Sequence, residues 1–235
     1  EEDGLGRLWI GTLGGGLNLL DRSRGSFTRF QHEGGISGSI SSNDITFIEN
    51  SVDGSLWIGT VSDGLNLFNE IDETFTTYHN IPGNPASLAS ENVYSLYSDR
   101  GGLFWVGAGG LNIYDKRLAR FSCSGPIESL TEELGEKSVY VIFEDSRGFI
   151  WAGSHNQGLV RLDPEKGTLS WYRHLQDDAN SLSHDGVSAI AEDSSAYIWI
   201  ATSGGGLNML DPRTGKWMHI KEQTGRPETA GLNHI

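Results

Sequence analysis

The sequence has a single cysteine and no long apolar run. Cys123 stands alone among 235 residues, which excludes an internal disulfide and a zinc site built from several cysteines. No apolar stretch approaches the roughly 18 residues that a membrane-spanning helix needs, and the opening Glu1-Glu2-Asp3-Gly4 is unlike a signal peptide. We therefore expect a soluble region cut from a longer protein, which reaches a membrane only through segments outside this chain.

Positive charge is also scarce. The chain has 17 Lys and Arg against 31 Asp and Glu, a formal net charge of -14. A charge of this sign repels phosphate backbones and anionic membrane surfaces. Nucleic acid is therefore not expected as a partner.

Tryptophan marks an internal repeat. Successive copies are separated by 48, 48, 46 and 48 residues, and each copy holds a phrase related to Leu-Trp-Ile-Gly-Thr. The repeated residues are Trp9, Trp57, Trp105, Trp151 and Trp199. A period of about 48 residues predicts one supersecondary unit per copy, so residues 1–235 are expected to form a single region of five repeats.

Each copy reads as four short strands. In the second copy these are residues 45–48, 55–60, 65–68 and 74–78, rich in β-branched and aromatic residues and separated by Gly, Asp, Asn or Ser. No stretch has a sustained helical period. The sequence predicts an all-β fold, a β-propeller of four-stranded antiparallel blades with about five blades in this chain.

The copies resemble a known family of repeats. The phrase Asp-x-x-Gly-x-Leu-Trp-Ile-Gly-Thr-x-x-Gly-Gly-Leu-x-x-x-Asp, best seen in residues 2–21 and 192–211, resembles the two-component-regulator propeller repeat. That resemblance implies an extracytoplasmic, periplasmic sensor region of a bacterial histidine-kinase or diguanylate-cyclase receptor. It also implies perception of a small ligand, such as an oligosaccharide, and an output domain beyond this chain.

Two arrangements of the repeats stay open. The end Leu232-Asn233-His234-Ile235 matches the opening of a first strand at Ser42-Asn43-Asp44-Ile45, so the ends could complete one blade of a closed five-bladed ring. The alternative is an arc of a larger ring, such as a seven-bladed one.

The repeated residues are predicted to be structural. The tryptophans are expected to pack in the core. The glycine two residues after four of them is expected to make room for a neighbouring blade; these are Gly11, Gly59, Gly107 and Gly153, with Ala201 in the last copy. Recurring asparagines on the third strand are expected to bond backbone groups between blades; these are Asn18, Asn66, Asn112 and Asn208. Asp and Gly residues are expected to form the turn between the first two strands.

Departures from the repeat are the better functional candidates, because loops can vary without cost to the ring. The turn between the second and third strands is rich in glycine in the other copies but polar in the second and fourth. The candidate ligand-binding residues are Ser154, His155, Asn156 and Gln157 in the fourth copy, and Ser62 and Asp63 in the second. Their amide, imidazole and hydroxyl groups suit a hydroxyl-rich, uncharged ligand.

The connections between blades are expected on the same face as these turns. They span residues 32–43, 79–92, 123–137 and 174–186. A recurring Ser-Ile-Ser-like phrase indicates that they serve mainly as loop structure. The connection 123–137 is the lengthened one and is expected to contribute to the entrance of the site.

Catalysis finds little support in the sequence. Carboxylates recur at turns and strand ends in register with the repeat, and the seven histidines lack metal-ligand spacing. No catalytic residue, metal site or cofactor is predicted. Two alternatives to the sensor stay open: a structural module that mediates homodimerisation or protein contact, and a propeller lyase related to the streptogramin-cleaving enzymes.

Overall fold

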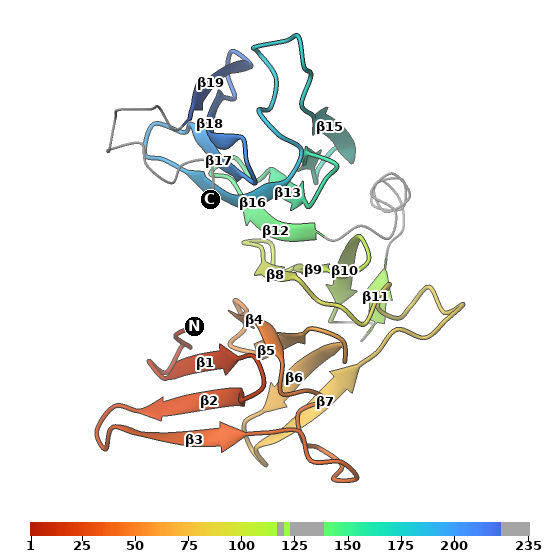
Figure 1. Cartoon of the computed structure of the whole chain (residues 1–235). Helices are drawn as coiled ribbons and strands as arrows, with labels where there is room; N and C mark the ends of the chain where they lie inside the picture. The colour runs from red at the N-terminus through yellow and green to blue at the C-terminus, as the bar shows by residue number, and fades with distance from the viewer. Residues whose placement is uncertain (117–119, 123–138, 222–235) are drawn as a thin grey trace. The chain divides into compact units, whose positions relative to one another are not determined.

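The structure is a computed structural model that describes residues 1–116, 120–122 and 139–221, and these residues form strands and turns without a helix (Figure 1). The first sheet contains β1 (Leu8–Thr12), β2 (Gly16–Asp21) and β3 (Ser26–Phe30). The second contains β4 (Ile45–Asn50), β5 (Leu56–Thr60), β6 (Leu65–Asn69) and β7 (Thr74–Tyr78). The third contains β8 (Ser95–Ser98), β9 (Phe104–Gly107), β10 (Leu111–Asp115) and β11 (Arg120–Ser122). The fourth contains β12 (Val139–Glu144), β13 (Ile150–Ser154), β14 (Leu159–Asp163) and β15 (Thr168–Tyr172), and the fifth β16 (Val187–Glu192), β17 (Ile198–Thr202), β18 (Gly206–Asp211) and β19 (Lys216–Ile220).

Each sheet is an antiparallel meander in which strands that follow one another in sequence are hydrogen-bonded neighbours. Among the described residues, four of the sheets have four strands and the first has three. The four strands predicted for the second repeat coincide with β4 to β7 to within two residues at either end. The prediction of an all-β propeller with four-stranded antiparallel blades is confirmed.

The described residues divide into two compact units, Glu1–Ile127 with the first three sheets and Glu128–Ile235 with the other two. Each unit is described by itself. That residues 1–235 form one region stays a prediction. The closed five-bladed ring and the arc of a larger ring both stay open. The matching segment 232–235 and the connection 123–137 lie outside the described residues.

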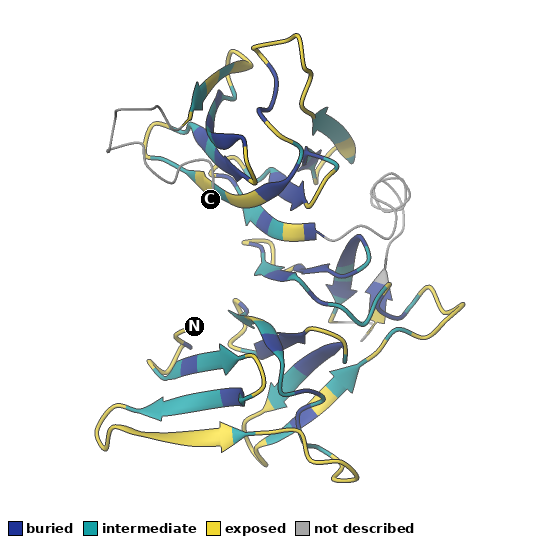
Figure 2. Cartoon of the chain, viewed as in Figure 1, coloured by how far each residue is buried: buried dark blue, intermediate teal, exposed yellow. Residues whose placement is uncertain are grey.

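Within each unit the core lies between successive sheets. One hydrophobic cluster joins residues of the second and third sheets, including Trp57, Leu65, Phe104 and Val106. Strands β5 and β13 are buried along their whole length, as the dark blue of Figure 2 shows. Their sequences are apolar on both faces because both faces are covered.

Glycines after the tryptophans let the sheets approach. A Cβ atom placed on Gly11 would lie 2.5 Å from Ile45 Cγ2 in the next sheet, and one on Gly153 would lie 2.5 Å from Val187 Cγ1. Gly59 stands in the same relation to Val93, at 2.7 Å. The predicted role of these glycines in packing is confirmed.

Four of the five repeat tryptophans are buried, with at most 4% of the side chain exposed, and Trp199 is partly buried. A different set of four, all except Trp57, donates a hydrogen bond to an aspartate in the turn before the tryptophan strand. This contact was not predicted from the sequence. Asp3, Asp99, Asp145 and Asp193 accept hydrogen bonds from Trp9, Trp105, Trp151 and Trp199 Nε1 at 2.8, 2.8, 3.0 and 2.8 Å. We call this the Asp–Trp clasp.

In every repeat the turn before the tryptophan strand ends in a residue with positive φ. Gly6, Gly54, Gly102 and Gly148 have φ between 74° and 86°, whereas Ala196 occupies the same place in the fifth repeat with φ of 63°. The expected Asp and Gly turn chemistry is confirmed, with one alanine in a glycine position.

The recurring asparagines hold the connection that leads into their own sheet. Asn66, Asn112 and Asn208 accept hydrogen bonds from the backbone N–H groups of Ser41, Ala89 and Ser183 at 3.0, 3.1 and 2.9 Å. Asn18 bonds carbonyls of its own sheet instead. The predicted backbone contacts are confirmed for three of the four asparagines.

Candidate functional site

The turn between β13 and β14 carries most of the candidate residues. Ser154 is fully buried; its Oγ donates to Gly158 O at 3.1 Å and accepts from Gln157 N at 2.7 Å. Thr60 and Thr202 make the same contact with the glycine four residues later. Ser154 therefore shapes the turn, as the threonines do elsewhere, and its side chain is not available to a ligand.

His155 and Asn156 form the exposed tip of this turn. The His155 ring lies 5.3 Å from the ring of Tyr140, at an interplanar angle of 44°. Gln157 is partly buried, and its Nε2 donates to Asn156 O at 3.1 Å. The tip thus presents an imidazole and an amide beside an aromatic ring.

Tyr140 was not predicted from the sequence. It lies at the bulge of β12, where the pairing with β13 shifts between Val139 and Val141, and 38% of its side chain is exposed. The same bulge position holds Thr46 in β4 and Ser188 in β16. A large aromatic residue where other repeats have a small hydroxyl residue was the available signal.

The connection between β15 and β16 packs against the same turn. Gly158 N donates to Asp185 O at 2.8 Å, and a Cβ atom on Gly186 would lie 2.8 Å from His155 O and 3.2 Å from the ring of His184. His184 is exposed. Tyr140, His155, Asn156 and His184 are thus gathered at one end of the fourth and fifth sheets, and we call them the Tyr140 cluster.

The second candidate pair lies in the other unit. In the turn between β5 and β6, Ser62 Oγ donates to Asp63 Oδ2 at 3.0 Å, and Asp63 N donates to Thr60 Oγ1 at 3.0 Å. Ser62 is exposed and Asp63 partly buried. This pair belongs to the unit of the first three sheets.

The connections between sheets are held by their own recurring contacts. His32 and His174 lie at equivalent places, and Nδ1 of each ring lies 2.9 and 2.8 Å from the carbonyls of Ile40 and Leu182. Ile40, Leu88 and Leu182, the central residues of the recurring phrase, are buried. The prediction that these connections serve as loop structure is confirmed for the described ones.

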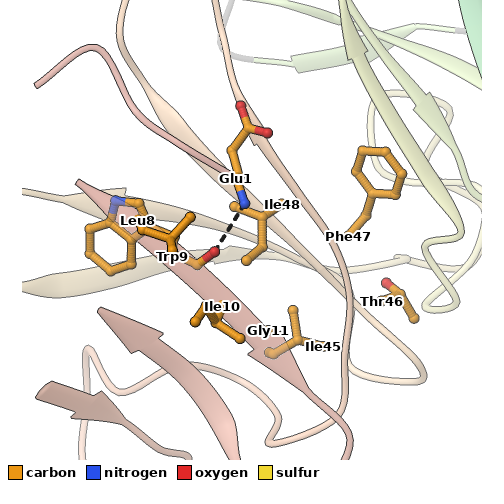
Figure 3. A pocket seen from close by; sticks show the side chains of 9 residues that line it. All are labelled: Glu1, Leu8, Trp9, Ile10, Gly11, Ile45, Thr46, Phe47 and Ile48. Atoms are coloured by element: carbon orange, nitrogen blue, oxygen red, sulfur yellow. Dashed lines mark hydrogen bonds between the residues drawn. The ribbon is translucent and has the colours of Figure 1, made fainter. Parts of the chain in front are cut away.

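A pocket of about 380 Å³ lies along the edge of β1 that no strand covers among the described residues (Figure 3). It is bounded by β1 residues 8–11 and β4 residues 45–48, and Glu1 closes one end by donating from its amino group to Trp9 O at 3.0 Å. The lining side chains are mostly aliphatic or aromatic, and Thr46 supplies the one hydroxyl. The pocket thus offers few groups that could orient a polar ligand.

The described residues hold no group of three or more His, Cys, Asp or Glu side chains that could bind a metal ion. In the same part of the chain no helix has the length and apolar character to cross a membrane.

Comparisons with known proteins bear on the family and the fold. The family model of the two-component regulator propeller matches residues 133–156, which include Tyr140, His155 and Asn156. No curated protein matches the sequence. The resemblance of the repeat to that family is confirmed.

Solved structures with the same fold include extracellular domains from B. thetaiotaomicron. The domain of BT3049, assigned to a hybrid two-component system, matches with a TM-score of 0.76 and 24% identity over 94% of this chain and 30% of its own length. The domain of BT4673, assigned likewise, matches with a TM-score of 0.73 and 18% identity over 96% of this chain and 31% of its own length. The chain therefore spans about a third of these relatives.

An enzyme also shares the fold. Virginiamycin B lyase from Staphylococcus aureus matches with a TM-score of 0.65 and 12% identity, over 96% of this chain and 69% of its own length. At these identities the likenesses show the fold alone.

Proposed function

We propose that this chain is part of the ligand-sensing propeller region of a bacterial signal-transduction receptor. The region lies in the periplasm, binds a small ligand, and passes the binding event to an output domain outside this chain. The observation that carries the proposal is the match of residues 133–156 to the two-component regulator propeller. The shared fold with extracellular domains of proteins assigned to hybrid two-component systems supports it.

The Tyr140 cluster is the proposed ligand surface. The half-exposed ring of Tyr140 offers an apolar face to the C–H groups of a sugar, and His155 and Asn156 offer donors and acceptors to its hydroxyls. Gln157 supports the tip of the turn. Ser62 and Asp63, in the unit of the first three sheets, are proposed as a separate contact group of their own. A net charge of -14 favours an uncharged ligand over a polyanion, so we propose a carbohydrate.

The proposal is tested by a ligand screen on wild type and on a His155→Ala/Asn156→Ala variant. Thermal shift against an oligosaccharide library identifies a binder, and titration calorimetry then measures its affinity. Loss of two to three hydrogen bonds from the site predicts a decrease in affinity of at least tenfold. A Tyr140→Ala variant should show a loss of similar size, because it removes the apolar face.

The matched control is Glu165→Ala/Lys166→Ala, which changes two exposed residues in the turn between β14 and β15, at the opposite strand ends. This variant should bind as wild type does. Equal binding by the His155→Ala/Asn156→Ala variant, or loss of binding in the control, would place the site elsewhere.

A propeller lyase is the enzymatic alternative, and the fold likeness to virginiamycin B lyase is the observation behind it. In the Tyr140 cluster, His155 and His184 come from separate connections. Incubation with virginiamycin B, followed by chromatography of the products, separates the two functions. The sensor proposal predicts that virginiamycin B stays intact at every protein concentration. Turnover that the His155→Ala variant abolishes would favour the lyase function instead.

A further inference from the structure

One repeat lacks the Asp–Trp clasp. Ser51 occupies the place of the clasping aspartate in the second repeat, six residues before Trp57. The backbone of its turn is unchanged, since Ser51 N donates to Ser55 O as Asp99 N donates to Leu103 O. The serine side chain is too short to reach the indole, and its Oγ bonds Asp53 Oδ1 instead.

Trp57 Nε1 is therefore left without an acceptor among the described residues. The Trp57 side chain is only 4% exposed. Asp53 does not replace the missing carboxylate, because its Oδ1 accepts from Ser55 N at 3.0 Å and its Oδ2 pairs with Lys116 Nζ. The Nε1 atom is not one of the fully buried atoms without a partner, so the N–H group is open to the pocket that Trp57 lines and can donate to a bound acceptor.

A pocket of about 300 Å³ opens at this place, between the second and third sheets of one unit. Ser51, Asp53, Trp57, Phe104, Tyr114 and Lys116 line it. Trp57 stacks on Phe104 with ring centroids 4.7 Å apart, and Tyr114 meets Trp57 edge-on at 5.0 Å. The pocket combines an apolar aromatic wall with a free indole donor and an ammonium group.

We propose that this Ser51 pocket binds a small organic carboxylate with an aromatic or apolar body. Its carboxylate accepts from Trp57 Nε1, as the aspartate does in the four other repeats, and its body lies along the aromatic wall. Lys116 adds a positive charge at the rim; 66% of its side chain is exposed, so the ammonium can turn from Asp53 to the ligand. A volume of this size suits a molecule of about ten heavy atoms.

The site goes beyond the proposed sensor function and does not depend on it, because none of its residues belongs to the Tyr140 cluster or to the pair Ser62 and Asp63. Loss of carboxylate binding would leave the carbohydrate screen unaffected, and the reverse also holds.

The test follows the indole N–H resonances of ¹⁵N-labelled protein during titration with benzoate, with sodium chloride at equal ionic strength as the blank. Trp57→Phe assigns the Trp57 resonance. The proposal predicts a saturable shift of that resonance, and at least tenfold weaker binding of benzyl alcohol, which has the same ring but no carboxylate.

Variants at position 51 supply the decisive comparison. Ser51→Asp places a carboxylate of the protein itself on the indole, so benzoate binding should fall at least tenfold. The control is Ile71→Ala, at an exposed position outside the pocket, which should bind as wild type does. Trp57→Phe keeps an aromatic side chain without the donor and should lose binding as measured by saturation-transfer NMR, which covers the case in which Ser51→Asp fails to fold.

Three results would overturn the proposal: no saturable shift of the Trp57 resonance, equal benzoate binding by Trp57→Phe and wild type, or equal binding of benzoate and benzyl alcohol.

Discussion

At the scale of the residue, Trp9, Trp105 and Trp151 are the largest fully buried side chains among the described residues. Trp151 is fully buried, stacks on Tyr172 with centroids 5.6 Å apart, and is clasped by Asp145. Trp57 is buried against Phe104 and Tyr114 without a clasp. Both side chains belong to the core and not to a surface for sugar stacking.

Trp151→Ala and Trp57→Ala are each expected to lower the free energy of unfolding by roughly 3–5 kcal/mol, the usual cost of deleting a large buried aromatic side chain. Urea denaturation measures the change. Ile71→Ala is the control, because Ile71 is 96% exposed and its truncation should change stability by less than about 0.5 kcal/mol. A tryptophan variant with wild-type stability would contradict the assignment to the core.

Ala196 carries backbone strain at the same scale. An alanine at φ of 63° stands where four other repeats have glycine. Ala196→Gly removes a conformational cost of about 1–2 kcal/mol, and the greater freedom of glycine in the unfolded chain offsets part of the gain. We expect a net stabilisation of about 0.5–1 kcal/mol in urea denaturation.

The reciprocal change is the control for this prediction. Gly148→Ala introduces the same strain in the fourth repeat, at φ of 86°, and should be destabilising. Destabilisation by Ala196→Gly would show that this turn does not require a glycine.

Glu49 gives the fold a specific pH dependence. Burial raises the pKa of Glu49 to about 7, and the hydrogen bond from Ser98 N, at 3.0 Å, offsets only part of that effect. The folded state therefore binds a proton more tightly than the unfolded chain, whose Glu pKa is about 4.3. This contribution to stability is complete below about pH 4 and is lost as the pH rises through 7.

Glu49→Gln removes this dependence because the amide is neutral at every pH and can still accept from Ser98 N. Relative to wild type, the variant should gain about 1–3 kcal/mol of stability between pH 5 and pH 8, a range that allows for the partial exposure of the site. Glu33→Gln, at an exposed position, is the control. A difference between Glu49→Gln and wild type that stays constant with pH would contradict the burial argument.

At the scale of the element, each sheet is an independent meander, and glycines set how closely successive sheets pack. Gly153 lies against both Val187 of the next sheet and Val141 of its own. Gly153→Ala would place a methyl group where no space exists. The expected cost is about 1–3 kcal/mol in urea denaturation.

A double variant separates overpacking from other effects of the alanine. Val187→Ala in the Gly153→Ala background opens space for the added methyl, so the double variant should lose less stability than the sum of the two single changes. Additive losses would contradict a direct contact between these two positions.

The strands and their packing glycines were predictable at this scale because a period of about 48 residues repeats the strand pattern five times and the glycine four times. The Asp–Trp clasp was not predictable, because an aspartate at this position is also typical of an ordinary turn. Nothing in the sequence indicates that its Oδ2 atom accepts a hydrogen bond from the tryptophan. Tyr140 was missed for a related reason. Its exposure depends on a bulge in β12, and a bulge is a feature of pairing between strands and not of one strand's sequence.

The candidate site was predicted in part. His155 and Asn156 lie exposed at the tip of their turn, whereas the hydroxyl group of Ser154 bonds within the turn. From the sequence, a serine that binds a ligand cannot be told from a serine that stabilises the turn. Only the contact with Gly158 distinguishes the two roles. Whether these residues bind a ligand stays a prediction.

At the scale of the whole molecule, a propeller places its variable turns and connections at one end of its sheets. In the unit of the fourth and fifth sheets, β12, the turn from β13 to β14 and the connection into β16 meet in the Tyr140 cluster. The turn from β14 to β15 lies at the opposite strand ends. The ligand is therefore expected to bind at this end of the sheets and not at the other.

Hydrogen–deuterium exchange with and without the ligand found by the oligosaccharide screen distinguishes the two ends. Binding at the Tyr140 cluster predicts slower exchange in residues 139–142, 154–158 and 183–187, with no change in residues 163–168. Slower exchange confined to residues 163–168, or no change at 139–142 and 154–158 under saturating ligand, would contradict it.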